Sequence, residues 1–164
     1  MDVVVTAYEL CMRFVCDKNG WNHPADAPHG KGWSAVRREF LQCMQKLTHI
    51  TQKMGATLIA IDHSKEETIE TSTGNFGKVT CAMPGQARSV ILPIPDHIWF
   101  LGYAEKEPGD ALKNTTSHRA LFVSGSSTVE AGCRDPKVRT KVIMPLSKKD
   151  PYNQIVKELY GANE

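Results

Sequence analysis

The sequence lacks the features that mark several classes of protein. No apolar run approaches the roughly 20 residues that cross a membrane, and the first residues lack the basic start and apolar middle of a signal peptide. The five cysteines are an odd number without a C-x-x-C pair, which favours reduced thiols in a cytoplasm-like compartment over a disulfide framework. A formal net charge of +2 is too small to indicate nucleic-acid binding by itself.

What is present is the composition of an ordinary soluble globule. The 164 residues are 41% hydrophobic and 23% charged. A chain of this length suits one domain and can bury a sizeable core.

One stretch organises the predicted fold. Residues 57–62 form a short apolar run, rich in β-branched residues, that follows Gly55 and becomes polar at Asp62. Such a run is typical of a strand buried on both faces inside a parallel sheet. Ligands gather at the carboxyl ends of such strands, so we expect a site around His63, Ser64 and Lys65.

Two helices are predicted before this strand. The first spans 3–18 and ends at Gly20; Val4, Cys11 and Val15 widen an apolar stripe formed by Val3, Ala7, Leu10 and Phe14. The second spans 33–54 and carries Val36, Phe40, Leu47, Ile50 and Met54 at helical spacing. A helix that runs directly into an apolar strand is the second half of a βαβ unit, which predicts a mostly parallel sheet.

The remaining elements follow from local patterns. We expect a hairpin centred on Gly74-Asn75, a short helix at 86–93, strands at 97–103 and 118–124, and a closing helix at 150–160 with Ile155, Val156 and Leu159 facing inward.

The loop 20–32 contains groups that could be taken for a site. His23, Asp26 and His29 do not match a zinc-ligand spacing. Gly30-Lys31-Gly32 is not a phosphate loop, because the upstream glycine and the Lys-Ser/Thr ending are both missing.

Several segments together resemble phage-encoded RecA/RadB-like nucleotide-binding proteins, which are P-loop ATPases of recombination and single-strand annealing. The resemblance covers about residues 1–145 and is carried by Trp21-Asn22-His23-Pro24, Gly30-Lys31-Gly32-Trp33-Ser34, Glu39-Phe40, Ile59-Ala60-Ile61-Asp62-His63-Ser64-Lys65-Glu66, Thr73-Gly74 and Pro84-Gly85-Gln86-Ala87-Arg88.

The resemblance implies an α/β fold, a partial RecA-like P-loop NTPase fold with a mostly parallel sheet flanked by helices. It implies one incomplete domain over 1–164, with a protruding hairpin at 64–85 and a basic segment with a closing helix at 126–164. The family's phosphate loop and Mg²⁺-binding strand precede the first helix, and neither pattern occurs here, so the chain resembles the carboxyl-terminal portion. The family uses ATP and Mg²⁺; this chain alone is expected to bind neither tightly.

The resemblance also assigns roles to single residues. His63 corresponds to a γ-phosphate sensor, and Lys65 to a second phosphate or DNA contact; a backbone-bonded histidine and a solvated lysine are the alternatives. Asp62 either binds Mg²⁺ or hydrogen-bonds a neighbouring loop. Arg134 and Arg139 would reach a neighbouring subunit's nucleotide.

In the hairpin, Phe76 would stack on a base of single-stranded DNA while Lys65, Lys78 and Arg88 contact phosphates, against the opposing charge of Glu66, Glu67 and Glu70.

The expected function is therefore that of a RecA-like, ATP-binding recombination protein, inactive alone, in the cytoplasm of a bacterial host and encoded by a phage or prophage. Its expected partners are single-stranded DNA and a second copy or RecA-like neighbour, since the edges of the strand 57–62 invite pairing. The alternatives are a non-catalytic module that binds DNA or a partner, and a metal-dependent hydrolase built on Asp62, His63 and the loop histidines.

Overall fold

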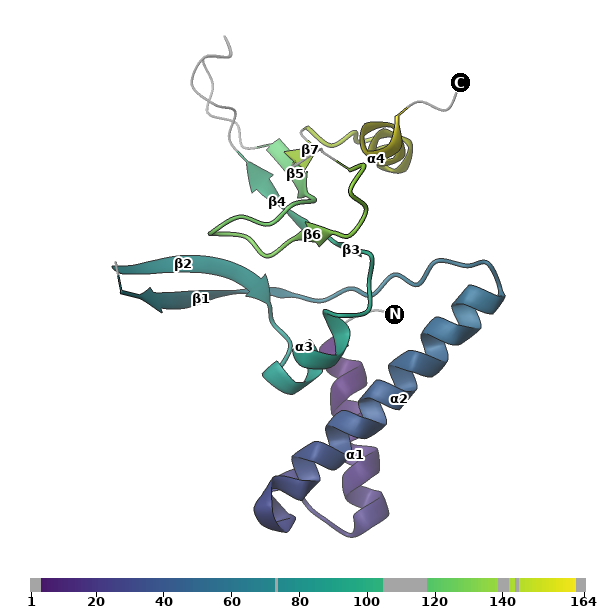
Figure 1. The fold of residues 1–164 in the computed structure, drawn as a ribbon, viewed down its shortest axis with the longest axis vertical. Coiled ribbons are helices and arrows are strands. Elements are labelled where there is room, and N and C mark those ends of the chain that lie inside the picture. The colour runs from purple at the N-terminus through teal and green to yellow at the C-terminus, as the bar shows by residue number, and fades with distance from the viewer. Residues whose placement is uncertain (1–3, 73, 105–117, 139–141, 144, 162–164) are drawn as a thin grey trace. The chain divides into compact units, whose positions relative to one another are not determined.

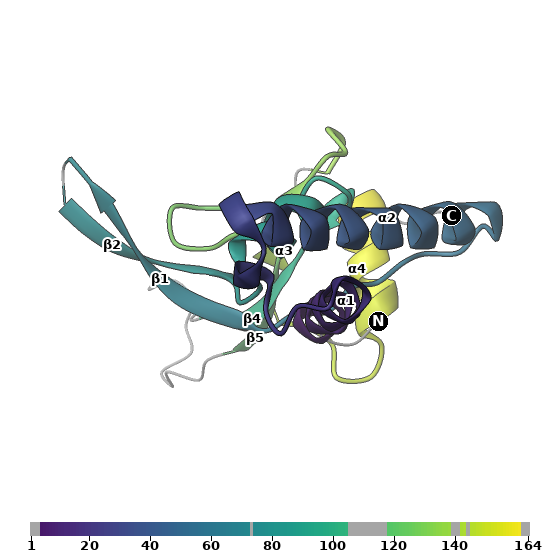
Figure 2. The same cartoon turned by 90° about the horizontal axis from the view of Figure 1, so that it is seen from below.

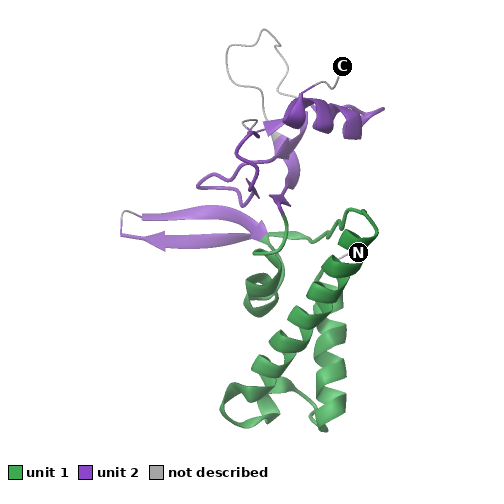
Figure 3. Ribbon diagram, turned by 45° about the vertical axis from the view of Figure 1, so that its right-hand side comes forward, with its two compact units in different colours: residues 1–65, 81–95 green, residues 66–80, 96–164 purple. Residues whose placement is uncertain are grey.

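The computed structural model describes residues 4–72, 74–104, 118–138, 142–143 and 145–161. The chain divides into two compact units, residues 1–65 with 81–95 and residues 66–80 with 96–164 (Figure 3). Helices and strands both occur, so the predicted mixed α/β class is confirmed. The single domain predicted for the whole chain stays a prediction.

The first unit is built on two helices, α1 (Val4–Asn19) and α2 (Lys31–Lys53), which pack against each other (Figures 1 and 2). Both helices are confirmed, with ends within two residues of the predicted ones. Gly20 and Gly55 follow them with φ values of 69° and 62°, a left-handed conformation that glycine adopts without a Cβ penalty.

The buried face of α1 differs from the predicted one. Tyr8 and Val15 are buried, whereas Leu10 and Phe14 of the predicted stripe are exposed. The Tyr8 ring packs edge-on against Phe40 of α2, with 5.2 Å between ring centroids. The predicted stripe is therefore wrong at Leu10 and Phe14, while Val4 and Val15 of its wider face are buried in the core and Ala7 and Cys11 pack against it.

A short helix, α3 (Gly85–Ile91), completes the core of the first unit and confirms the helix predicted near this position. It is tied to α2 by Arg37, whose Nε donates a hydrogen bond to Ser89 Oγ at 3.1 Å. The buried core residues are Val4, Tyr8, Val15, Val36, Phe40, Met44, Met83, Ala87, Val90 and Ile91.

The strand predicted at 57–62 is wrong. Residues 56–63 have no regular secondary structure, and Ile59 and Ile61 are 66% and 53% exposed. Leu58 packs against the helical core, and the Ile61 carbonyl accepts a hydrogen bond from Val4 N at 2.9 Å. An apolar run becomes a buried strand only where other strands complete its ladder, and no strand of the described chain does so.

The next two strands, β1 (Ser64–Thr71) and β2 (Gly74–Cys81), form a two-stranded hairpin, drawn as a twisted ribbon with opposite strand directions in Figure 2. The predicted hairpin is confirmed. Its predicted centre is wrong, because Gly74 and Asn75 already belong to β2.

The second unit contains short strands in small sheets. One sheet pairs β3 (His97–Ile98) with β6 (Gly132–Cys133), and a second has the order β4-β5-β7, formed by Phe100–Ala104, His118–Phe122 and Val142–Ile143. These pairings are antiparallel. The strand predicted at 118–124 is thereby confirmed, whereas the single strand predicted at 97–103 is divided at Trp99 into β3 and β4, which belong to different sheets.

A mostly parallel sheet is not what the described strands form. Val79 and Val129 make an isolated parallel bridge, but the ladders between β3, β4, β5, β6 and β7 are antiparallel. Parallel neighbours need a crossover, usually a helix that runs directly from one strand to the next. Here α2 leads into the irregular segment 56–63, so no βαβ unit forms around it.

The closing helix α4 (Pro151–Tyr160) confirms the prediction for 150–160. Asp150 caps it, with Oδ1 accepting a hydrogen bond from Asn153 N at 3.2 Å. Leu159 joins the second core, which also contains Leu121, Val123 and Ile143. None of the helices in the described parts of the chain is long and apolar enough to cross a membrane.

The start of α2 generates a stability prediction. A Cβ added to the buried Gly32 would overlap the carbonyl oxygen of Pro24, a backbone atom that cannot move aside. Gly32→Ala should therefore lower the free energy of unfolding by about 2 kcal/mol or more, measured by urea denaturation. Gly85→Ala at the start of α3, where a Cβ meets open space, is the matched control. Equal stability of the two variants would contradict this account.

Candidate functional site

His63 lies between the irregular segment and the hairpin. Its side chain is exposed, and β1 begins at the next residue. Its main-chain carbonyl accepts a hydrogen bond from Ala82 N at 2.8 Å, just after the end of β2. The sheet that was expected to place His63 at a carboxyl edge is absent from the described chain, so its sensor role rests on the resemblance and stays a prediction.

Asp62, the residue before His63, also accepts a hydrogen bond from a residue that follows β2. Its Oδ2 accepts a hydrogen bond from Met83 N at 3.1 Å, which confirms the interpretation that Asp62 bonds a neighbouring loop. Its Oδ1 is buried and has no hydrogen-bond partner among the residues that the structure describes. The chain therefore uses one carboxylate oxygen to fix a loop, while the second is shielded from solvent.

The two bonds together form what we call the base clamp, the hydrogen bonds from Ala82 N to His63 O and from Met83 N to Asp62 Oδ2. Consecutive residues before β1 bind consecutive residues after β2. Met83 is also buried in the core of the first unit. The clamp consequently joins the residues before β1 to the residues after β2 within the first unit.

Three of the residues assigned to DNA lie on the hairpin. Lys65 is exposed on β1, and Phe76 and Lys78 lie on one face of β2 because side chains alternate along a strand. Phe76 is exposed and Lys78 is half-buried. The acidic residues of this region, Glu66, Glu67 and Glu70, are all on β1.

Arg88 lies elsewhere, half-buried on α3 in the first unit. Arg134, assigned to nucleotide, is exposed just after β6, and its main-chain N–H donates to Asp96 O at 2.9 Å. Arg139 is outside the described residues. The structure thus places Lys65, Phe76 and Lys78 on the two strands of one hairpin.

The polar residues of the loop before α2 serve local structure. Asp26 Oδ2 accepts hydrogen bonds from Asn22 N and His23 N, and His23 Nδ1 accepts one from Ala25 N. In the described part of the chain, no three His, Cys, Asp or Glu side chains lie where they could hold a metal ion. The loop histidines therefore give no support to a metal-dependent hydrolase.

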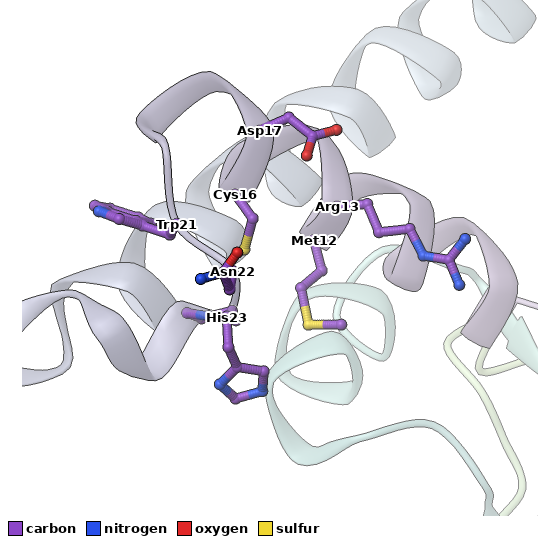
Figure 4. A pocket seen from close by; sticks show the side chains of 8 residues that line it. Met12, Arg13, Cys16, Asp17, Trp21, Asn22 and His23 are labelled. Atoms are coloured by element: carbon purple, nitrogen blue, oxygen red, sulfur yellow. The ribbon is translucent and has the colours of Figure 1, made fainter.

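A pocket of about 200 Å³ lies between the end of α1 and this loop (Figure 4). No sequence pattern predicted it. Trp21 and Arg13 both line it, and in Figure 4 their side chains extend in opposite directions. Burial, followed by the carboxylates of Asp17 and Asp26, raises the pKa of the Cys16 thiol. A protonated thiol is a poor nucleophile, so the raised pKa gives no support to a cysteine active site in this pocket.

Comparisons with known proteins were made for the whole chain. A family model described as "AAA domain" matches residues 1–134, a range that includes the hairpin, the base clamp and Arg134. No curated protein and no solved structure matches the chain.

All five cysteines are free thiols, which agrees with the expectation of reduced cysteines and makes their reactivity measurable. Burial, followed by Glu39 and Cys43, raises the pKa of Cys11 to about 11, whereas Cys43 itself is exposed. At pH 8 the thiolate fraction of Cys11 is then lower than that of an ordinary cysteine by about a hundredfold. Alkylation followed by mass spectrometry should modify Cys43 first and leave Cys11 and Cys16 largely unmodified; rapid modification of Cys11 would contradict the packing of α1 on α2.

Proposed function

The chain belongs to the AAA domain family of P-loop-type ATPases, and from this premise we propose that it is the phosphate-sensing and DNA-contacting part of a RecA-like ATPase of DNA recombination. In this proposal His63 senses the γ-phosphate, the hairpin β1–β2 binds single-stranded DNA, and hydrolysis depends on a neighbouring subunit.

The observation that carries the proposal is the base clamp. His63 bonds Ala82 through its own carbonyl, so a movement of His63 displaces the residue that follows β2. Asp62 transmits the same movement to Met83, which belongs to the packed core. A ligand that favours one position of His63 would therefore bias the hairpin, which is the physical requirement for coupling nucleotide to DNA.

The residues present do not fit a tightly bound nucleotide by themselves. The sequence has no G-x-x-x-x-G-K-[ST] motif, whose backbone amides and lysine hold the phosphates in P-loop ATPases. His63 and Lys65 are both exposed, with no described glycine-rich loop to enclose a phosphate. We therefore derive no catalytic step within this chain, and propose that a RecA-like neighbour supplies the phosphate loop while Arg134 and Arg139 reach toward its nucleotide.

The hairpin supports the DNA-binding part of the proposal. Phe76 supplies an exposed ring for base stacking, and Lys78, two residues along the same strand, supplies a cation for a phosphate. Lys65 on β1 and Arg88 on α3 are the further phosphate contacts proposed from the resemblance. The same resemblance gives the proposed setting, a phage-encoded protein of single-strand annealing in a bacterial cytoplasm.

A second function, a non-catalytic module that binds DNA or a partner subunit, is favoured by two observations. The sequence lacks a phosphate loop, and Ile59 and Ile61 expose apolar side chains that a second chain could cover. The two functions are separated by measuring whether ATP changes DNA binding when a P-loop-bearing neighbour is present. The first function predicts such a change and its loss in His63→Ala, whereas the second predicts no change.

The purified chain is expected to release no more phosphate from ATP and Mg²⁺ than its His63→Ala variant does. The reason is that neither protein holds the β- and γ-phosphates in line for attack. Phosphate release is measured at saturating ATP, with circular dichroism to verify that both proteins are folded. Turnover by the unaltered chain above the variant would overturn the dependence on a neighbour.

The double variant Phe76→Ala, Lys78→Ala should bind oligo(dT) at least tenfold more weakly, because base stacking on one ring contributes about 1–3 kcal/mol. The slope of log K against log[salt] should also become shallower by about 0.7, because one phosphate contact with a single strand is lost. Both quantities are measured by fluorescence anisotropy.

The control for this measurement removes the same two residue types elsewhere. Phe14 and Lys18 are neighbours on α1, with Lys18 Nζ 5.8 Å from the Phe14 ring centroid, and Phe14 is exposed. Phe14→Ala, Lys18→Ala should leave oligo(dT) binding unchanged. Equal losses in the two double variants would show that binding is not located on the hairpin.

A further inference from the structure

A row of large exposed side chains follows the extended chain through β3 and β4 in the second unit. Trp99, Leu101 and Tyr103 are 44%, 52% and 71% exposed, and we call these three residues the exposed row. Leu101 and Tyr103 occupy alternate positions of β4, so they lie on one face of that strand, and Trp99 precedes β4 at the same spacing. None of them belongs to the described core of this unit, which is built on β5, β7 and α4.

The sheet topology explains why the row is uncovered. β4 is the edge strand of the sheet β4-β5-β7. Leu101 is opposite Leu121 in the antiparallel register, yet only Leu121 is buried, in the cluster that contains Leu159 of α4. The helix therefore packs against β5 and the edge strand β7, whereas Leu101 on the other edge strand, β4, stays exposed.

Both ends of the exposed row carry polar or aromatic neighbours. Tyr103 is directly opposite Arg119, which is exposed, so the guanidinium and the phenol ring share one face. At the other end, the Trp99 ring lies 5.5 Å from the His97 ring, and His97 Nε2 hydrogen-bonds the Tyr160 hydroxyl at 2.8 Å. These contacts fix the ring of His97 beside Trp99.

The charge of the surrounding sequence is strongly one-sided. Residues 118–149 contain seven Lys or Arg and two Asp or Glu, in a chain whose formal net charge is only +2. Of these cations, Arg119 is placed beside the row by the strand register, opposite Tyr103. Exposed rings with a neighbouring cation are the combination with which proteins bind single-stranded nucleic acid, through base stacking and phosphate contacts. A protein partner that covered this face would instead be expected to meet fewer cations.

We propose that the exposed row is a second binding surface for single-stranded nucleic acid, with bases stacked on Trp99 and Tyr103 and a phosphate bound by Arg119. The strand rise places these two aromatic residues about 13 Å apart, room for more than one nucleotide between them. This inference rests on the proposed function for the identity of its ligand, but it places the contact on a different element from the hairpin.

The test compares a double substitution with a single control substitution in the full chain. Trp99→Ala, Tyr103→Ala should weaken oligo(dT) binding by at least tenfold, whereas Tyr152→Ala should not change it. Tyr152 lies on α4 and is 72% exposed, so its removal matches the loss of Tyr103 without touching the row. Because the substituted side chains are exposed, thermal melting should be the same for all three proteins.

A second probe separates stacking from charge. An abasic oligonucleotide of equal length keeps the phosphates and loses the bases, so the double variant and the unaltered chain should bind it equally. Arg119→Ala should instead weaken the binding of both oligonucleotides. An unchanged oligo(dT) affinity in Trp99→Ala, Tyr103→Ala, or an equal loss for the abasic strand, would overturn the proposal.

The hairpin variant distinguishes a failure of the proposed function from a failure of the inference about the exposed row. If only Phe76→Ala, Lys78→Ala loses binding, the proposed function stands and the exposed row is excluded. If only Trp99→Ala, Tyr103→Ala loses it, the row stands and the hairpin is excluded as the DNA site. A loss of self-association in the row variant without a loss of oligo(dT) binding would identify the row as an interface between copies, and would overturn its role in binding nucleic acid.

Discussion

The structure of the first unit depends on how the residues that precede β1 are joined to those that follow β2. Two hydrogen bonds do this, from Ala82 N to His63 O and from Met83 N to the Asp62 carboxylate. The segment that leads to them has no strand partners in the described chain, and it is also held by the bond from Val4 N to Ile61 O and by Leu58, which packs against the helices. Burial of Met83 among the helices links the second of the two bonds to the packed core of the first unit.

The helices could be predicted from the sequence because their signals are local. Helical spacing identified α1, α2 and α4, and glycines marked the ends of the first two. The inward face of α1 could not be predicted, since both of its apolar stripes satisfy the same periodicity and only contact with Phe40 selects the one that contains Tyr8. The strand prediction for 57–62 was wrong for a related reason. An apolar run indicates that a segment can be buried, but a strand also needs partners from distant parts of the chain.

Some features of the candidate site could likewise be predicted from the sequence, and others could not. The bond from Asp62 to a neighbouring loop could be anticipated, and the alternation that puts Phe76 and Lys78 on one face is readable in the sequence. The identity of Met83 as the partner depends on where the hairpin returns, which no local pattern specifies. The exposed row had a visible signal, the alternation of Trp99, Leu101 and Tyr103, but the same pattern is typical of a strand that packs against a core. Only the edge position of β4 distinguishes the two cases.

The distribution of charge constrains how one nucleic-acid strand could use both surfaces. The hairpin carries Glu66, Glu67 and Glu70 beside Lys65 and Lys78, so its field opposes phosphates, and attraction there would have to come from stacking on Phe76. The segment 118–149 is basic, so charge contributes to attraction near the exposed row. Salt screens charge much more than it weakens stacking. Rising ionic strength should then release a bound strand from the exposed row first and leave it held by the ring of the hairpin.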